Sequence, residues 1–360
     1  MKRISYLDGH RGIAILLVLL YHAFSRWTEL VPYGNDFADF PLFRFGYLGV
    51  ELFFLISGFV ILMTLEKFNS FTEFMYHRWL RLFPAMLICS LFVFFTAQYF
   101  IERPNGIPLA RDLIPGMSFI DPYLLGKLSG EDFNNIENSF WSLYIEFKFY
   151  IIAAIFYSFL GSKNLVVALF LCFITYFVFK EIKPLTDHKA VYYISAISNY
   201  LGFKYFGWFA AGASYYLFVK EDNKIWFIFG AIICLISSIV LAVEAKSFST
   251  FIAIAIISIF FSTSLISNKL QQLISNRFLL AFGFVSYPLY LLHENMMIAI
   301  IIKTQNILPS NLSIILPFLA ISLIFMVAYF IAKKVERPLK KTIESFFTKV
   351  RLFYKNRLKN

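Results

Sequence analysis

The stretch that decides the fold is residues 47–66, YLGVELFFLISGFVILMTLE, in which Glu51 is the one charged residue before the closing Glu66. Its length matches the roughly 20 apolar residues that an α-helix needs to cross a bilayer. Because lipid cannot pair with backbone N–H and C=O groups, only helices and closed barrels span membranes. A barrel strand is about half as long and alternates apolar with polar residues. This stretch therefore predicts a transmembrane helix.

The composition of the whole chain agrees with this interpretation. Hydrophobic residues make up 59% of the 360, charged residues 15%, and the mean hydropathy is +0.69. A soluble domain carries roughly 25% charged residues, so this chain lacks the polar surface of a water-soluble globule. We expect an all-α integral membrane protein, a bundle of about ten transmembrane helices with both termini cytoplasmic. The expected spans are 12–25, 47–66, 83–101, 139–160, 164–180, 200–219, 225–244, 247–266, 278–302 and 312–334.

Three further features concern the remaining segments. The longest interruption, 102–138, contains four prolines and is interpreted as an irregular loop. The cysteines, Cys89, Cys172 and Cys234, lie within apolar runs, which is typical of small packing residues rather than disulfides or metal ligands. The first apolar run resembles a signal peptide, but no small-residue cleavage site follows it, so we expect a retained helix.

The distribution of basic residues predicts the orientation. With both termini inside, the cytoplasmic segments hold 21 Lys and Arg and the outer loops about 10, although ten of the 21 lie in the C-terminal tail. The inner loops are shorter, so their basic density is higher.

We expect a membrane domain over 1–335 and a basic amphipathic cytoplasmic tail over 336–360. In the tail, apolar residues at helical spacing face Lys and Arg, which suits a helix lying on an anionic leaflet. These apolar residues are Ile343, Phe346, Phe347, Val350 and Phe353. Nucleic-acid binding is the weaker interpretation of the net charge of +11.

Ionisable residues within the spans are costly and therefore candidates for function. His22 follows Arg11 by eleven residues, which places it ~16 Å deeper, in the outer half of the membrane. On the same topology Glu51, Glu146 and His293 fall in the outer half or near the middle. Histidine titrates near neutrality and burial raises the pKa of a carboxyl, so two His and two Glu suit general acid–base chemistry.

A different chemistry is expected at the cytoplasmic side. Arg78 and Arg81 share one helix face at spacing i, i+3 before the span that we expect at 83–101. Paired guanidiniums bind phosphate in a bidentate manner, so together with Arg11 they suit an anion site.

Structural roles are the alternative for each of these residues. Arg78 and Arg81 also fit positive-inside anchors, and His293 fits a hydrogen-bonded core histidine. The carboxylates Glu51 and Glu146 also fit ion pairs with Lys148 or Lys204. The shared depth of the four acid–base groups favours function.

Five segments resemble the signatures of the membrane acyltransferase 3 family, and they occur in the family's order. They cover residues 6 to about 293, which is the whole expected membrane unit. The matching segments are 6–14 (YLDGHRGIA) followed by His22, 49–59 (GVELFFLISGF), Arg78-x-x-Arg81, 140–150 (FWSLYIEFKFY) and 286–293 (SYPLYLLH).

The resemblance implies a membrane O-acyltransferase of a bacterial inner membrane. Members of the family move an acyl group, usually acetyl from acetyl-CoA, onto surface carbohydrates such as lipopolysaccharide, peptidoglycan or exopolysaccharide. The implied partners are acetyl-CoA as co-substrate, a carbohydrate acceptor and membrane lipids, with no permanently bound cofactor, no metal and no nucleic acid.

The resemblance also implies roles for individual residues. Arg11, Arg78 and Arg81 would hold the CoA phosphates on the cytoplasmic side. His22 would be the catalytic base or a transient acyl carrier, with Glu51 or Glu146 orienting its ring. His293 completes the expected catalytic set. The residues expected to bind substrate are Trp141, Ser142, Tyr150 and Tyr290.

The sequence departs from the family pattern in three places. Lys148 stands where many relatives have an uncharged polar residue, and Glu294-Asn295 follow His293 where a proline is expected nearby. Some relatives carry an extracellular hydrolase-like domain after the membrane unit, whereas a short basic tail follows here. We therefore expect no second transfer step on this chain.

Three other functions stay open from the sequence. A related enzyme would use a bulkier donor such as succinyl-CoA, or a lipid or small-molecule acceptor. A glycan or lipid transporter would also bury His and Glu along a path, although no internal repeat is visible. A structural scaffold would not need the layered His and Glu residues.

Overall fold

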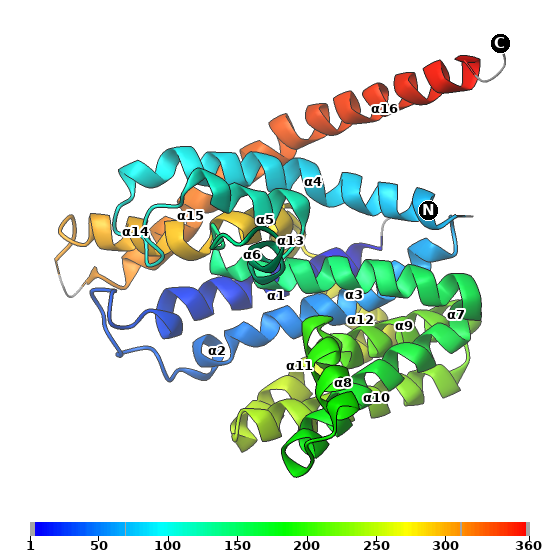
Figure 1. Ribbon diagram of the computed structural model, residues 1–360. Coiled ribbons are helices and arrows are strands. Elements are labelled where there is room, and N and C mark those ends of the chain that lie inside the picture. Colours follow the sequence, from blue (N-terminus) through cyan, green and yellow to red (C-terminus); the bar gives the residue numbers. More distant parts are fainter. Residues whose placement is uncertain (1–3, 69, 310–311, 358–360) are drawn as a thin grey trace. The chain divides into compact units, whose positions relative to one another are not determined.

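The computed structural model describes residues 4–68, 70–309 and 312–357, and every regular element in these ranges is a helix (Figure 1). The chain divides into two compact units, each assembled from separate stretches of sequence. The first unit contains Met1–Glu29, Tyr33–Tyr76 and Trp141–Ser286, and the second contains Leu30–Pro32, His77–Phe140 and Tyr287–Asn360.

The first unit is built mainly from long apolar helices. Its α-helices are α1 (Ser5–Tyr21), α2 (Pro41–Arg44), α3 (Gly49–Leu65), α7 (Trp141–Ile182), α8 (Lys189–Tyr200), α9 (Phe206–Glu221), α10 (Lys224–Glu244), α11 (Phe248–Ile266) and α12 (Asn268–Ile274), together with the first part of α13 (Arg277–Leu292). Its short 3-10 segments are η2 (Gly46–Leu48), η6 (Lys183–Leu185) and η7 (Phe203–Tyr205), and η1 (His22–Arg26) is π-helical.

Helix α9 lies at the centre of this unit, packed against α3, α7 and α10 (Figure 1). Glycines bring α3 and α9 into backbone contact: a Cβ on Gly58 would lie 2.0 Å from the Phe209 carbonyl oxygen, and one on Gly212 would lie 1.9 Å from that of Leu55. Small residues at helix crossings allow this close approach in membrane proteins.

The second unit contains the polar interruption and the C-terminal helices. Its α-helices are α4 (Phe71–Thr96, from His77 onward), α5 (Leu113–Ser118), α6 (Pro122–Ser129), the end of α13, α14 (Glu294–Thr304), α15 (Ile315–Phe330) and α16 (Arg337–Arg357). Its 3-10 segments are η3 (Ala97–Tyr99), η4 (Ala110–Asp112) and η5 (Asn138–Phe140), and η9 (Ile331–Glu336) is π-helical.

Seven helices in the described ranges are long and apolar enough to cross a membrane, or up to eight if the bent pair α13–α14 counts as one span. Two features separate this number from the expected ten. Helix α7 includes two of the expected spans, with a non-helical break at Gly161 (φ 73°, ψ −178°). Helix α9 is apolar and buried but only 16 residues long.

Several predicted boundaries are wrong, for identifiable reasons. Helix α4 begins at Phe71 rather than at 83, because its charged first turns are helical although they are not apolar. The segment 102–138 is not wholly irregular: Pro122 occupies the first turn of α6, which Asp121 caps, and proline is favoured at that position. The expected span 278–302 is bent by 78° between Leu292 and Glu294.

Candidate active site

His22 is the first residue of the π-helical segment η1, directly after α1. Its Nδ1 lies 2.9 Å from the carbonyl oxygen of Val18. A carbonyl oxygen only accepts hydrogen bonds, so Nδ1 carries the proton and the lone pair of the neutral ring lies on Nε2. Single-turn π segments in helices often occur at functional sites. The ring is thus held in one tautomer by the backbone.

Glu146 lies on α7, where two hydroxyl groups bond to one of its oxygens. Ser57 of α3 donates to Oε1 at 2.6 Å, and Tyr150 of α7 donates to the same atom at 2.5 Å. Within the described part of the chain Glu146 makes no ion pair. The site is therefore a carboxylate positioned by hydroxyls, and it joins two segments that are distant in the sequence.

Glu51 is buried in the first turn of α3, beside Lys204 and Tyr205, at a cavity of only about 10 Å³. Its Oε2 has no hydrogen-bond partner among the residues that the structure describes. Lys204 instead makes an ion pair with Glu244 at 2.6 Å, and Lys180 pairs with the same carboxylate. The ring of Tyr205 also contacts Trp141, with 5.3 Å between the ring centroids.

These contacts bear on two interpretations of the carboxylates. Lys148 donates to the carbonyl oxygen of Tyr200 at 2.8 Å and lies over the ring of that residue, while Lys204 pairs with Glu244. Among the described residues these lysines thus have other partners at hydrogen-bond distance, although Lys204 still acts electrostatically on Glu51. Lys148 anchors α7 to the end of α8 instead.

His293 is completely buried in the second unit, at the break between α13 and α14. Its Nδ1 lies 2.8 Å from the carbonyl oxygen of Tyr290, so the same tautomer argument places the lone pair of the ring on Nε2. The Tyr290 hydroxyl donates to the carbonyl oxygen of Ser139 at 3.1 Å. Tyr290 thus links the helix break to the segment just before α7.

A buried polar network that the sequence analysis missed surrounds this break. Glu137 accepts hydrogen bonds from the backbone N–H and the side chain of Asn295, at 2.7 and 2.8 Å. Arg103 pairs with Glu137 at 3.3 Å, and both side chains are almost fully buried. Glu294 accepts from the backbone N–H of Ser139 at 2.6 Å. Burial raises the pKa of Glu137 to about 7, while the Arg103 guanidinium opposes the shift and the Glu294 carboxylate adds to it.

One sequence feature pointed to this network: at Glu294-Asn295 the chain departs from the family pattern. These residues replace an expected proline, and in the structure they hold the segment 137–139 through charge-assisted hydrogen bonds. Arg103 and Glu137 were passed over because they lie in a segment interpreted as irregular.

The three arginines expected to bind the donor are placed as follows. In the first unit, Arg11 donates to Asp8 at 2.8 Å, one turn earlier on α1. In the second unit, Arg78 is buried on α4, and Arg81 of the same helix interacts electrostatically with Glu336 of η9.

Ser142 is buried on α7, whereas Trp141 is 38% exposed. All three cysteines are free and buried, as predicted. Within the described ranges, no three His, Cys, Asp or Glu side chains gather in a way that fits a metal ion.

A family model described as an acyltransferase domain, that of acyltransferase 3, matches residues 4–332. The chain belongs to the acyltransferase 3 family. The resemblance predicted from the five sequence segments is thereby confirmed. Membership, together with the apolar helices, indicates a multi-pass membrane protein.

Individual relatives of this acyltransferase 3 chain share parts of it. An O-acetyl transferase of Shigella phage Sf6 is 25% identical over 181 residues, 49% of this chain and 52% of the relative. The O-acetyltransferase OatA of Staphylococcus aureus is 29% identical over 182 residues, 46% of this chain and 27% of the relative. The chain thus spans about half of the first relative and about a quarter of the second. No solved structure matches. These relatives support O-acyl transfer as the class of reaction.

Proposed function

We propose that this acyltransferase 3 protein transfers an acetyl group from cytoplasmic acetyl-CoA to a hydroxyl of a surface or lipid-linked glycan, in the inner membrane of a bacterium. The observation that carries the proposal is the hydrogen bond from His22 Nδ1 to the Val18 carbonyl oxygen. It leaves Nε2 as the basic atom, as a general base requires.

In the proposed reaction the acetyl group passes directly from the thioester to the acceptor hydroxyl. His22 Nε2 takes the proton of the acceptor hydroxyl while its oxygen attacks the thioester carbonyl. The attack forms the C–O bond of the new ester, and the C–S bond of the thioester then breaks. The departing CoA thiolate takes the proton from the His22 imidazolium and leaves as free CoA. An acyl-histidine intermediate is the alternative path through the same atom. The backbone carbonyl of Val18, rather than Glu51 or Glu146, is the partner that orients the ring at Nδ1.

The donor phosphates are assigned to the arginines. Arg11 has its guanidinium oriented by Asp8, and Arg78 and Arg81 lie one helical turn apart on α4. A planar guanidinium matches the bidentate geometry of phosphate oxygens. We expect these residues to contribute to binding of acetyl-CoA rather than to the chemical step.

A topology of ten crossings with both termini cytoplasmic fits this assignment. Two polar clusters of the first unit support it. Glu66 accepts from Ser162 and Lys220, each at 2.7 Å, and Glu244 pairs with Lys180 and Lys204. The second part of α7 contains Ser162 of the Glu66 cluster and Lys180 of the Glu244 cluster. Helix α9 follows Lys204 and contains Lys220, and α10 ends at Glu244. The eight spans include the bent pair α13–α14 and count α7 once. Counting the two parts of α7 separately and adding α9 gives ten.

The test compares surface glycan from cells with and without the gene by mass spectrometry, and cells carrying His22→Ala. We expect glycan O-acetylation to disappear without the gene and to fall at least ~100-fold in the variant, the usual contribution of a positioned acid–base group. Purified protein in nanodiscs with radiolabelled acetyl-CoA should reproduce the loss in kcat.

His10→Gln is the matched control. His10 is a second buried histidine of α1, but it bonds to Ser264 at 2.8 Å and is no part of the proposed chemistry. A glutamine retains a donor for that bond, so activity should persist. Unchanged glycan in His22→Ala cells with normal protein levels would refute the role of His22.

A further inference from the structure

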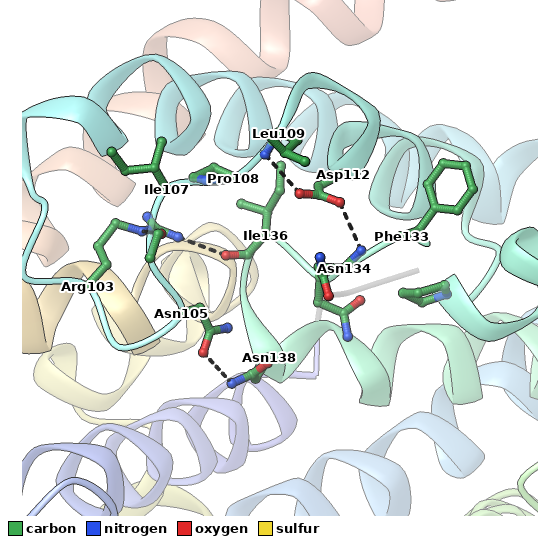
Figure 2. A pocket seen from close by; sticks show the side chains of 13 residues that line it. Arg103, Asn105, Ile107, Pro108, Leu109, Asp112, Phe133, Asn134, Ile136 and Asn138 are labelled. Carbon is green, nitrogen blue, oxygen red and sulfur yellow. Dashed lines mark hydrogen bonds between the residues drawn. The ribbon is translucent and has the colours of Figure 1, made fainter. Parts of the chain in front are cut away.

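The second unit contains a cavity of about 640 Å³ formed entirely by the segment between α4 and α7. Figure 2 shows the side chains around it. The volume lies within the ~300–1,000 Å³ range of small-molecule sites. The residues lining it are Arg103, Asn105, Gly106, Ile107, Pro108, Leu109, Asp112, Pro122, Phe133, Asn134, Asn135, Ile136 and Asn138.

The walls of this cavity are held in place by hydrogen bonds across it. The two oxygens of buried Asp112 accept from the backbone N–H groups of Leu109 and Asn134, each at 2.8 Å. Arg103 donates to the Ile136 carbonyl oxygen at 2.8 Å, and Asn138 donates to Asn105 at 2.9 Å (Figure 2). The cavity is therefore pre-formed, which lowers the entropic cost of binding a ligand.

Neutral amides dominate its available polar groups. The Asn134 side chain makes no hydrogen bond within the described ranges, and Nδ2 of Asn105 and Oδ1 of Asn138 are likewise uncommitted there. An amide offers both donors and an acceptor, and so does each hydroxyl of a sugar. Phe133 adds an aromatic face that suits the C–H face of a sugar ring.

The charges of the residues that line the cavity disfavour a phosphate-rich ligand. Arg103 is the one cationic residue among those that line the cavity, and it is already paired with Glu137. Asp112 adds a negative charge. This environment disfavours a nucleotide such as CoA and favours a neutral ligand rich in hydroxyls.

The cavity wall is also attached directly to the helix break that carries His293. The backbone N–H of Asn105 donates to Oδ1 of Asn295 at 3.0 Å, two residues after His293. Glu137 connects Arg103 of the wall to the backbone of Asn295. A ligand in the cavity therefore lies against residues that position the break between α13 and α14.

We propose that this cavity is the acceptor subsite and binds a neutral sugar of the glycan through Asn105, Asn134 and Asn138, with the ring against Phe133. The proposal rests on the proposed function, because it names where the acceptor of that reaction binds. It adds a residue set that lies outside all five signature segments.

The test measures binding separately from catalysis. The probe is surface polysaccharide purified from cells lacking the gene, added to purified full-length protein in nanodiscs without donor. We expect Asn134→Leu and Phe133→Leu each to weaken its binding about tenfold and to raise the KM for polysaccharide similarly, with the KM for acetyl-CoA unchanged. Asn134 is exposed and its side chain makes no described bond, so its substitution should leave folding intact.

The control is Asn35→Leu, an exposed asparagine of the first unit. Equal polysaccharide affinity in wild type, both cavity variants and the control would overturn the proposal. A wild type that binds polysaccharide, loses that binding in the cavity variants and yet transfers no acetyl group would support the cavity and refute the proposed function. The two failures are therefore distinguishable.

Discussion

Ser57 donates a hydrogen bond of 2.6 Å to Glu146, and this bond joins α3 to α7 across 89 residues of sequence. Each residue belongs to a different segment that resembles the family signatures, 49–59 and 140–150. Tyr150 donates to the same carboxylate oxygen. The two segments thus form one polar cluster, in which two hydroxyls fix the direction of the carboxylate.

Replacing Ser57 by alanine tests whether that direction matters. A hydrogen bond to a charged group contributes about 1.5–3 kcal/mol, and Tyr150 still holds the carboxylate in the variant. We therefore expect Ser57→Ala to lower kcat about tenfold, equivalent to ~1.4 kcal/mol in the barrier. The measurement is the rate of acetyl transfer from labelled acetyl-CoA to polysaccharide, at equal amounts of folded protein.

Ser158→Ala is the matched control for that experiment. Ser158 is also on α7, but among the residues that the structure describes its hydroxyl bonds only to the carbonyl oxygen of Ala154, one turn earlier, at 2.8 Å. Its loss should change kcat less than twofold, roughly the weak effect of a local side chain–backbone bond. Equal losses of kcat in the two variants would refute a specific role for the hydrogen bond from Ser57 to Glu146.

The fold was predictable from the sequence where a helix is a long, uninterrupted apolar run. The apolar runs gave the helices α3, α10 and α11 nearly to the residue, because a span of about 20 apolar residues leaves few alternatives in lipid. The bend at His293 and the π segment at His22 were not predictable, because an apolar helix and its distortions have the same composition. The short helices of 102–138 were hidden by their prolines.

The site was predictable as a set of residues but not as a set of contacts. Sequence position alone identified Glu146 but not its partners Ser57 and Tyr150, because a hydroxyl on an apolar helix gives no signal of what it bonds. Arg103 and Glu137 were missed for the opposite reason: charged residues in a loop are ordinarily solvated, and only the packing shows that this pair is buried.

The Arg103–Glu137 pair gives a second prediction. Removing one partner of a buried ion pair leaves an uncompensated charge and costs about 3–5 kcal/mol, whereas replacing both by apolar residues is often nearly neutral. We expect Arg103→Met to lower the thermal midpoint in detergent more than the double variant Arg103→Met with Glu137→Met does. A double variant that is the less stable of the two would contradict this.

The same carboxyl predicts a pH dependence of stability. Burial raises the pKa of Glu137 from its ordinary 4.5 to about 7. A carboxyl with a higher pKa in the folded state favours its protonated form, so its stabilising contribution is full below pH ~4.5 and is lost as pH rises through ~7. We expect the thermal midpoint to fall between about pH 4.5 and pH 7 and to level off above that. Glu137→Gln should flatten that slope, and an unchanged slope would assign it to other groups.

The close approach of α3 and α9 gives the last prediction. A methyl group on Gly58 would lie 2.0 Å from a backbone oxygen, and backbone cannot move aside as a flexible side chain can. Overpacking of this kind costs about 1–3 kcal/mol or more, because the two helices must separate. We expect Gly58→Ala to lower the thermal midpoint and the yield of membrane-inserted protein. Gly126→Ala on α6 is the control, since its Cβ would meet a single atom at 3.1 Å. If both variants lose the same stability, the contact between α3 and α9 is not the cause.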